Sequence, residues 1–168
     1  RRVPPARRGA RGDHTPARAH ATRDTTARAA APGAQGPVPA PAASGVPVAV
    51  ADQVAEAVRD RLAKVVVGHP AEESVRMGAL ASLDQREEVR RSVQALLLAG
   101  RLVCGDPDHV DVVGASAERG AFMAPLLLLG DDASRPEPHQ VEAFGPVSTI
   151  IGYRDTPEVI ELAARGLK

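Results

Sequence analysis

The residues best suited to chemistry lie in one short segment, Val141–Val147, which reads Val-Glu-Ala-Phe-Gly-Pro-Val. The carboxylate of Glu142 offers several lone pairs and could accept two hydrogen bonds from the hydroxyls of a ribose. The ring of Phe144, two positions further on, could pack against a flat heterocycle. The same residue types also occur as a helix-end carboxylate and a core aromatic, and composition alone favours that structural interpretation.

Cys104 is the only cysteine and therefore the only candidate thiol nucleophile. A reactive thiolate needs a helix N-terminus or a nearby cation to lower its pKa. Cys104 instead follows the apolar pair Leu102-Val103, after the expected end of a helix. We predict that it is a small buried hydrophobe and not a catalytic residue. A single cysteine also excludes an intramolecular disulfide and a zinc site built from cysteines.

The other polar residues match no motif for metal or phosphate binding. The five histidines form no pair spaced three or four residues apart, so two imidazoles are not expected on one helix face. Asp106, Asp108 and Asp111 resemble part of a calcium loop, but the required glycine and bidentate glutamate are missing. Neither of the glycine-rich nucleotide motifs and no serine hydrolase elbow occurs. No metal site is predicted.

Two helices are predicted in the first half of the region that would position these residues. Valines and a leucine at helical spacing over 50–65 indicate an amphipathic helix, which should end near Gly68. Ser82 and Gln85 have the capping-box form, with a hydroxyl three residues before an amide. A second helix should follow them and end at Gly100.

Three strands are predicted, at 102–104, 122–129 and 147–151. Four consecutive leucines in the second indicate burial on both faces, and the third is rich in β-branched residues. Thr156, as a capping hydroxyl, and Pro157 should begin a last helix. The alternation predicts an α/β fold with three strands and flanking helices. Because three strands alone would expose hydrophobic edges, we infer further strands upstream and downstream.

Composition divides the chain near residue 47. Residues 1–50 contain no Leu, Ile, Phe, Tyr, Trp, Met, Cys, Lys or Glu, and Ala, Arg, Pro and Gly account for 35 of the 50. Such a segment cannot bury enough apolar area to offset its chain entropy. We therefore predict a disordered segment at 1–47 and a folded domain at 48–168.

The arginines of the first segment have two interpretations. Residues 1–50 hold eight Arg and two Asp, so a basic arm could neutralise nucleic-acid phosphates. The alternative is a tail without function, or translation of a GC-rich gene in a shifted frame, and the composition favours this alternative. One Tyr, two Phe and no Trp leave little aromatic surface for base stacking, so we expect no nucleic-acid partner.

Neither a membrane segment nor a secretory signal is predicted. No apolar run approaches the roughly 20 residues of a membrane span. The first residues include arginines but no apolar stretch of the kind that a signal peptide needs. We therefore expect a cytoplasmic protein without a membrane partner.

The segment Glu142-Ala143-Phe144-Gly145-Pro146 resembles the E-x-F-G-P motif of the aldehyde dehydrogenase superfamily. Further similar stretches follow in family order, at 64–70, 77–80, 83–99 and 120–129. The resemblance covers about residues 48–168 and implies a partial aldehyde dehydrogenase catalytic domain that works with NAD or NADP. In that family the glutamate binds the nicotinamide ribose and the phenylalanine contacts the nicotinamide ring. The resemblance thus implies that Glu142 and Phe144 bind the cofactor.

Residues 75–82 and 139–149 are most similar to the dehydrogenase half of bifunctional ring-opening enzymes of phenylacetate degradation. This similarity implies the oxidation of a CoA-linked semialdehyde, with NADP preferred, although the residues present do not decide between NAD and NADP. Because the family oligomerises through strands near the catalytic domain, a homo-oligomer is expected for the intact protein.

Three parts of the family's catalytic machinery have no counterpart in this sequence. The nucleophilic cysteine, in a G-Q-x-C context, is expected some dozens of residues before Lys64, where residues 1–50 hold no cysteine. The general-base glutamate and the Rossmann-type domain should lie earlier still. Cys104 matches a non-catalytic strand position. We expect an enzyme fragment that is inactive alone. A frame shift near Val46 is one explanation for the missing machinery. The alternative function is that of a remnant with a non-enzymatic interaction, or with a basic arm that binds nucleic acid.

Overall fold

The computed structural model describes residues 43–165, and the predictions made for residues 1–42 lie outside this range. Four strands form one sheet in the order β1, β6, β5, β3. Strands β1, β6 and β5 are parallel to one another, and β3 is antiparallel to β5. The four strands are β1 (Ala43–Pro47), β3 (Gly100–Cys104), β5 (Leu126–Gly130) and β6 (Val147–Tyr153).

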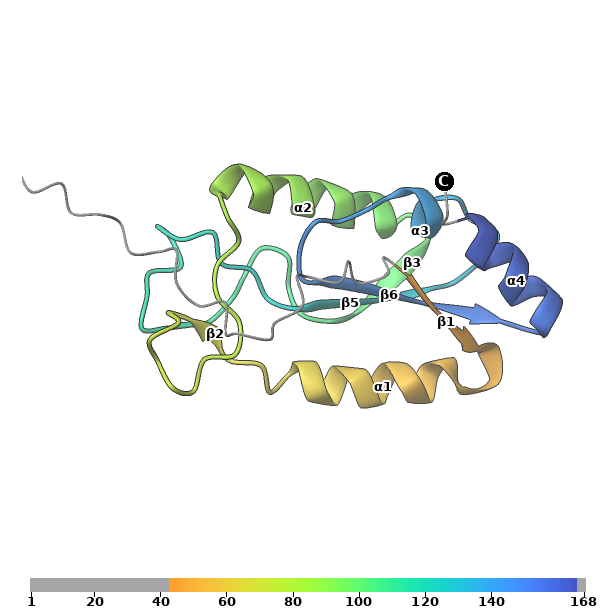
Figure 1. The fold of residues 1–168 in the computed structure, drawn as a ribbon, viewed down its shortest axis with the longest axis horizontal. Coiled ribbons are helices and arrows are strands. Elements are labelled where there is room, and N and C mark those ends of the chain that lie inside the picture. The colour runs from red at the N-terminus through yellow and green to blue at the C-terminus, as the bar shows by residue number, and fades with distance from the viewer. Residues whose placement is uncertain (1–42, 166–168) are drawn as a thin grey trace, which may run out of the picture. The chain divides into compact units, whose positions relative to one another are not determined.

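Helices cover both faces of this sheet, with α1 on one side and α2 on the other (Figure 1). The short helix α3 lies in the connection from β5 to β6, and α4 follows β6. A separate pair of parallel strands, β2 and β4, and a turn of 3-10 helix, η1, complete the fold. The bounds are η1 (Val48–Val50), α1 (Ala51–Leu62), β2 (Val67–Gly68), α2 (Leu83–Leu96), β4 (Val112–Val113), α3 (Glu137–Gln140) and α4 (Thr156–Arg165).

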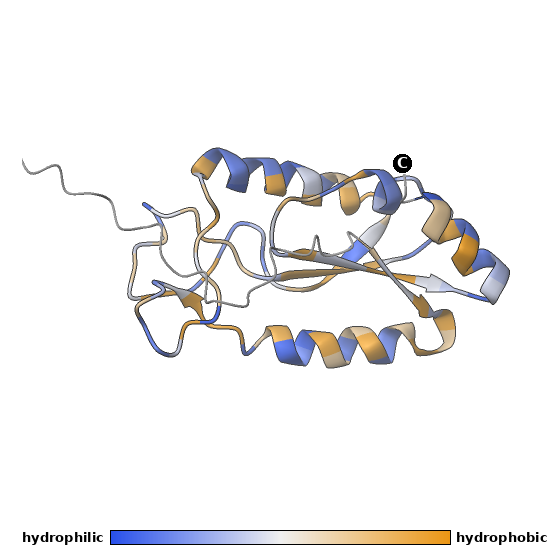
Figure 2. Ribbon diagram, viewed as in Figure 1, coloured by the Kyte–Doolittle hydropathy of each residue, from blue (hydrophilic) through white to orange (hydrophobic). Residues whose placement is uncertain are grey.

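The leucines of the central strand β5 connect the two layers of helices. Because successive side chains of a strand point to opposite faces, this run supplies both sides of the sheet. Leu127 and Leu129 pack in the cluster that contains α1, whereas Leu126 packs with Val89 and Val93 of α2. Figure 2 shows apolar residues along the middle of the sheet and polar residues on the outward side of α2. Burial of each leucine stabilises the fold by about 1.5–3 kcal/mol.

The predicted α/β architecture is confirmed, and all three predicted strands are present. The second strand is shorter than predicted, because it begins at Leu126 and not at residue 122. Pro125 immediately precedes it and has no N–H to donate to a ladder. Residues 121–123 are nevertheless buried, so their apolar character reflects a packed loop. This explains why the pattern extended too far.

The predicted boundary at residue 47 is wrong for the last five residues of the first segment. Ala43–Pro47 form β1, which pairs in parallel with β6 at the edge of the sheet. Their own composition, with Gly45 and Pro47, is poor for a strand. The strand depends on its neighbours, and Gly45 packs closely against them. A Cβ added at Gly45 would lie 3.3 Å from Val159 of α4 and 3.6 Å from Tyr153 of β6.

The start of α4 also differs from the prediction by one residue. The carboxylate of Asp155 accepts a hydrogen bond from the Glu158 N–H at 2.9 Å, so Asp155 and not Thr156 caps the helix. Glu158 in turn accepts a hydrogen bond from the Arg154 N–H. These two contacts form a reciprocal capping arrangement.

No helix within residues 43–165 is both long and apolar enough to cross a membrane.

Candidate functional site

The segment that holds Glu142 and Phe144 connects α3 to β6 and runs along α2 (Figure 1). Both side chains are exposed, and 64% of Phe144 is accessible to solvent. The interpretation of Phe144 as a core aromatic is therefore wrong. An exposed carboxylate and an exposed ring two residues apart are available to a ligand that offers hydroxyls and a flat ring.

Three contacts fix the backbone of residues 141–146, which we call the 141–146 loop. The Gln85 Nε2 donates a hydrogen bond of 2.7 Å to the carbonyl oxygen of Phe144. The Leu126 N–H donates to the carbonyl of Pro146 at 2.8 Å and so joins the loop to β5. Gly145 lies against α2, because a Cβ added there would meet a methyl of Val89 at 2.7 Å. The loop is thus held by a helix and by a buried strand.

The first turn of α2 supplies one of these contacts. Ser82 caps the helix, with its hydroxyl accepting a hydrogen bond from the Gln85 N–H at 3.0 Å. The Gln85 Oε1 accepts one from the Ala81 N–H at 2.9 Å. The predicted capping box is confirmed, apart from the return bond, which reaches Ala81 and not Ser82 itself. The sequence pattern marked Gln85 as a helix-start residue but gave no sign of its contact with the loop.

Cys104 lies away from this loop. Its half-buried side chain packs in the cluster formed with α1, and its Sγ lies 3.9 Å from the carbonyl oxygen of Arg59. The 141–146 loop packs against Val89, which belongs to the cluster on the α2 side of the sheet. The sheet therefore separates Cys104 from Glu142 and Phe144, and the structure does not bring the three together.

The acidic loop that resembled part of a calcium site is a capped turn. The Asp106 carboxylate accepts hydrogen bonds from the backbone N–H groups of Asp108, at 2.8 Å, and His109, at 3.2 Å. This side chain therefore satisfies its own turn. Within residues 43–165 no group of three or more His, Cys, Asp or Glu side chains could hold a metal ion.

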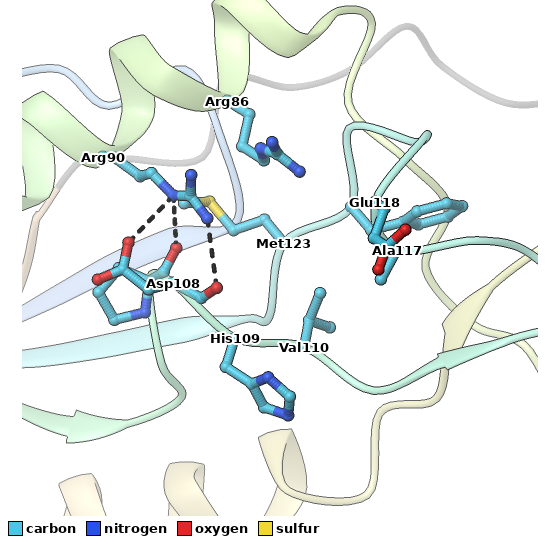
Figure 3. A pocket seen from close by; sticks show the side chains of 10 residues that line it. Arg86, Arg90, Asp108, His109, Val110, Ala117, Glu118 and Met123 are labelled. Carbon is cyan, nitrogen blue, oxygen red and sulfur yellow. Dashed lines mark hydrogen bonds and ion pairs between the residues drawn. The ribbon is translucent and has the colours of Figure 1, made fainter.

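A hollow of about 270 Å³ lies between α2 and the loops at 107–110 and 117–123 (Figure 3). Arg90 donates from Nε to the carbonyl oxygen of Pro107 at 2.8 Å, and its Nε lies 3.4 Å from the Asp108 carboxylate. Arg86 donates to the carbonyl oxygen of Gly120 at 3.2 Å. Each arginine thus attaches a loop to the helix, which indicates a structural role.

Comparison with known proteins identifies the family of the chain. The profile of the Aldehyde dehydrogenase family matches residues 43–165. A 3,4-dehydroadipyl-CoA semialdehyde dehydrogenase from Aromatoleum evansii is 36% identical over 101 residues, which are 60% of this chain and 20% of that protein. Protein MaoC from Klebsiella aerogenes is 38% identical over 94 residues, covering 54% of this chain and 26% of its own length. The chain therefore spans about a fifth to a quarter of these relatives.

Solved structures show the same fold. Aldehyde dehydrogenase C from Pseudomonas syringae, in complex with NAD⁺ and octanal, aligns with a TM-score of 0.65 and 27% identity over 75% of this chain and 25% of its own. An aldehyde dehydrogenase from Mycobacterium tuberculosis complexed with NAD⁺ aligns with a TM-score of 0.62 and 25% identity over 73% of this chain and 24% of its own. With the family profile matched over all the residues that the structure describes, the chain belongs to the aldehyde dehydrogenase family.

Proposed function

We propose that the 141–146 loop, which we now call the cofactor loop, binds the nicotinamide half of NAD or NADP in an aldehyde dehydrogenase reaction. Glu142 would accept hydrogen bonds from the ribose hydroxyls, and Phe144 would pack on the nicotinamide ring. The observation that carries this proposal is the exposure of both side chains on a backbone fixed from α2 and β5. Solved relatives whose structures contain NAD⁺ support the choice of cofactor.

The residues present fit a nicotinamide riboside in charge and in shape. A carboxylate accepts hydrogen bonds only, and a ribose diol offers two donors. The exposed ring of Phe144 presents apolar surface, and its burial by a ligand would contribute about 25 cal/mol of binding free energy per Å². A loop that is already held in place loses little conformational freedom when a ligand binds. These three properties together favour a flat, hydroxyl-bearing ligand over a simple anion.

The role of this chain in the reaction is to hold the cofactor in place. A nicotinamide cofactor held by these residues would supply the hydride acceptor for the oxidation of an aldehyde. Glu142 and Phe144 would restrict the position of that ring by holding the ribose and one ring face. In the family, a cysteine thiolate and a general base carry out the other steps. Residues 1–50, where the family cysteine is expected, contain no cysteine. We therefore propose that the chain alone does not turn over aldehydes.

A CoA-linked semialdehyde is the proposed substrate of the intact protein. The relative whose name specifies 3,4-dehydroadipyl-CoA semialdehyde is 36% identical over the matched residues, which supports this class. The selection between NAD and NADP is assigned to the dinucleotide domain of the family, outside this chain. The homo-oligomer and the cytoplasmic location expected from the sequence stay predictions.

A titration of the full 168-residue chain with NADP⁺ and NAD⁺, followed by NMR, tests the proposed cofactor site. We expect chemical-shift changes concentrated in residues 141–146, and an affinity that falls about tenfold or more in Glu142→Gln, because a bond to a charged acceptor is lost. Glu161→Gln is the matched control, since Glu161 is also exposed but lies on α4. Equal affinities of the two variants, or shift changes elsewhere, would contradict the proposal.

A further inference from the structure

We infer that His139 is a positioning residue for Glu142, holding the end of α3 so that this carboxylate lies where the nicotinamide ribose would bind. The inference rests on the proposed function of the cofactor loop. His139 belongs to α3 and comes three residues before Glu142. Its side chain contacts the protein backbone and not the ligand, so its effect on binding would pass through Glu142.

The imidazole of His139 joins α3 to the loop that follows β5. Its Nε2 lies 3.0 Å from the carbonyl oxygen of Ala133, and the side chain is half-buried. A carbonyl oxygen can only accept a hydrogen bond, so this partner assigns a proton to Nε2. The contact is therefore a hydrogen bond that the ring donates to the loop.

The loop at 131–135, which supplies this carbonyl, is fixed by contacts that do not involve the imidazole. The Asp131 N–H donates to the carbonyl oxygen of Ala99 at 3.1 Å. Nη1 of Arg165, on α4, donates to the carbonyl oxygen of Ser134 at 3.3 Å. The loop is thus attached to the segment before β3 and to α4, and it can serve as a fixed anchor for α3.

α3 is a single turn, and one turn of helix is marginal unless other contacts support it. Its start is held by Glu137, whose carboxylate accepts a hydrogen bond of 2.6 Å from Arg135. The carbonyl oxygen of Glu137 accepts the Val141 N–H at 2.9 Å, so the turn continues up to the residue before Glu142. Without the hydrogen bond from His139, the end of the turn next to Glu142 loses its anchor on the loop.

The other half of the cofactor loop is fixed from a different element. Gln85 of α2 holds the carbonyl of Phe144, and this contact does not depend on α3. Loss of the His139 hydrogen bond should therefore displace the carboxylate of Glu142 and leave the ring of Phe144 in place. We expect weaker binding of the ribose together with an unchanged contact to the nicotinamide ring.

The test compares His139→Phe with His109→Phe in the full chain. Phenylalanine keeps a ring but has no donor for Ala133, and His109 is the control because its side chain is 76% exposed. We expect His139→Phe to weaken NADP⁺ binding about three- to tenfold, the range of one lost hydrogen bond, and His109→Phe to leave it unchanged. His139→Gln, whose amide can donate to the same carbonyl, should restore most of the affinity. Equal affinities of His139→Phe and the unaltered chain would overturn the inference.

Double variants decide whether His139 acts through Glu142. Added to Glu142→Gln, the change His139→Phe should cost little further affinity, whereas added to Phe144→Ala it should cost the full three- to tenfold. In saturation-transfer NMR, the ratio of ribose to nicotinamide-ring signals should fall in His139→Phe. A merely structural role would weaken both signals together and add equally in both backgrounds, and that result would contradict the inference.

Amide hydrogen exchange tests the positioning role without any ligand. The Val141 N–H should exchange faster in His139→Phe than in the unaltered chain, and His139→Gln should reverse the change. If the unaltered chain binds no nucleotide, the proposed function fails, and unchanged exchange at Val141 would separately overturn the role of His139. If a urea titration shows that His139→Phe is unfolded, His139→Asn replaces it, because its amide is polar but too short to reach Ala133.

Discussion

Gly145 is the residue at which the loop and α2 come closest. Gly145→Ala would place a methyl group 2.7 Å from a methyl of Val89, on the well-packed side of α2. We expect overpacking to lower the free energy of unfolding by about 1–3 kcal/mol, measured in urea. The double variant Gly145→Ala/Val89→Ala should lose less unfolding free energy than the two single variants lose together. If the two losses simply add, the contact between Gly145 and Val89 is contradicted.

Glu142 and Phe144 should separate function from folding. Because both side chains are exposed, Glu142→Gln and Phe144→Ala should each change the free energy of unfolding by less than about 0.5 kcal/mol. Both should weaken nucleotide binding, since each removes a proposed contact. A urea titration beside a binding titration measures the two effects. Loss of stability in either variant would indicate a structural role.

The candidate residues could be predicted from the sequence, but the contacts that hold their loop in place could not. Glu142 and Phe144 stand in a recognisable motif next to an expected strand, which made them candidates. The contacts that hold them come from Gln85 and Val89, more than 50 positions earlier in the chain. No local pattern reports a contact between distant segments, because it depends on how α2 lies over the sheet.

At the scale of elements, β5 should dominate stability. Leu127 is 1% exposed and packs between the sheet and α1. We expect Leu127→Ala to cost about 2–5 kcal/mol of unfolding free energy, from lost burial and the cavity left behind. Leu98→Ala, at a residue 71% exposed, is the control and should be nearly neutral. Chemical denaturation gives both values, and similar losses would contradict the assigned core.

The start of α4 should depend on pH through Glu158. Hydrogen bonds from Arg154 hold the pKa of the Glu158 carboxyl below its ordinary value of 4.5. The ionised form is therefore favoured in the folded state, so its contribution is present above about 4.5 and is lost as the pH falls through the lower, folded value. Hydrogen exchange of α4 amides should rise over that acidic range. Glu158→Gln should show no such step, and an identical rise in that variant would contradict the assignment.

The elements differ in how well their own sequences specify them. The capped start of α2 and the presence of the leucine-rich strand were predictable, since local hydrogen bonds and burial on two faces leave clear patterns. Strand β1 was not, because Ala43–Pro47 contain little that favours a strand and depend on pairing with β6. Tertiary pairing overrides a weak local preference at such an edge.

At the scale of the molecule, residues 43–165 form a two-sided sheet whose outer strands are β1 and β3. This is a family fold that spans only about a fifth to a quarter of the relatives it matches. We therefore propose that this chain holds one half of the ligand, the nicotinamide riboside, and that other segments of the family hold the adenine half.

Saturation-transfer NMR on the full chain with NADP⁺ measures this division most directly, because it reports which ligand protons approach the protein even when binding is weak. We expect strong transfer to the nicotinamide ring and its ribose, little transfer to the adenine, and loss of the ring signal in Phe144→Ala. Transfer that is strongest at the adenine, or the same in Phe144→Ala as in the unaltered chain, would contradict the proposed division of the ligand.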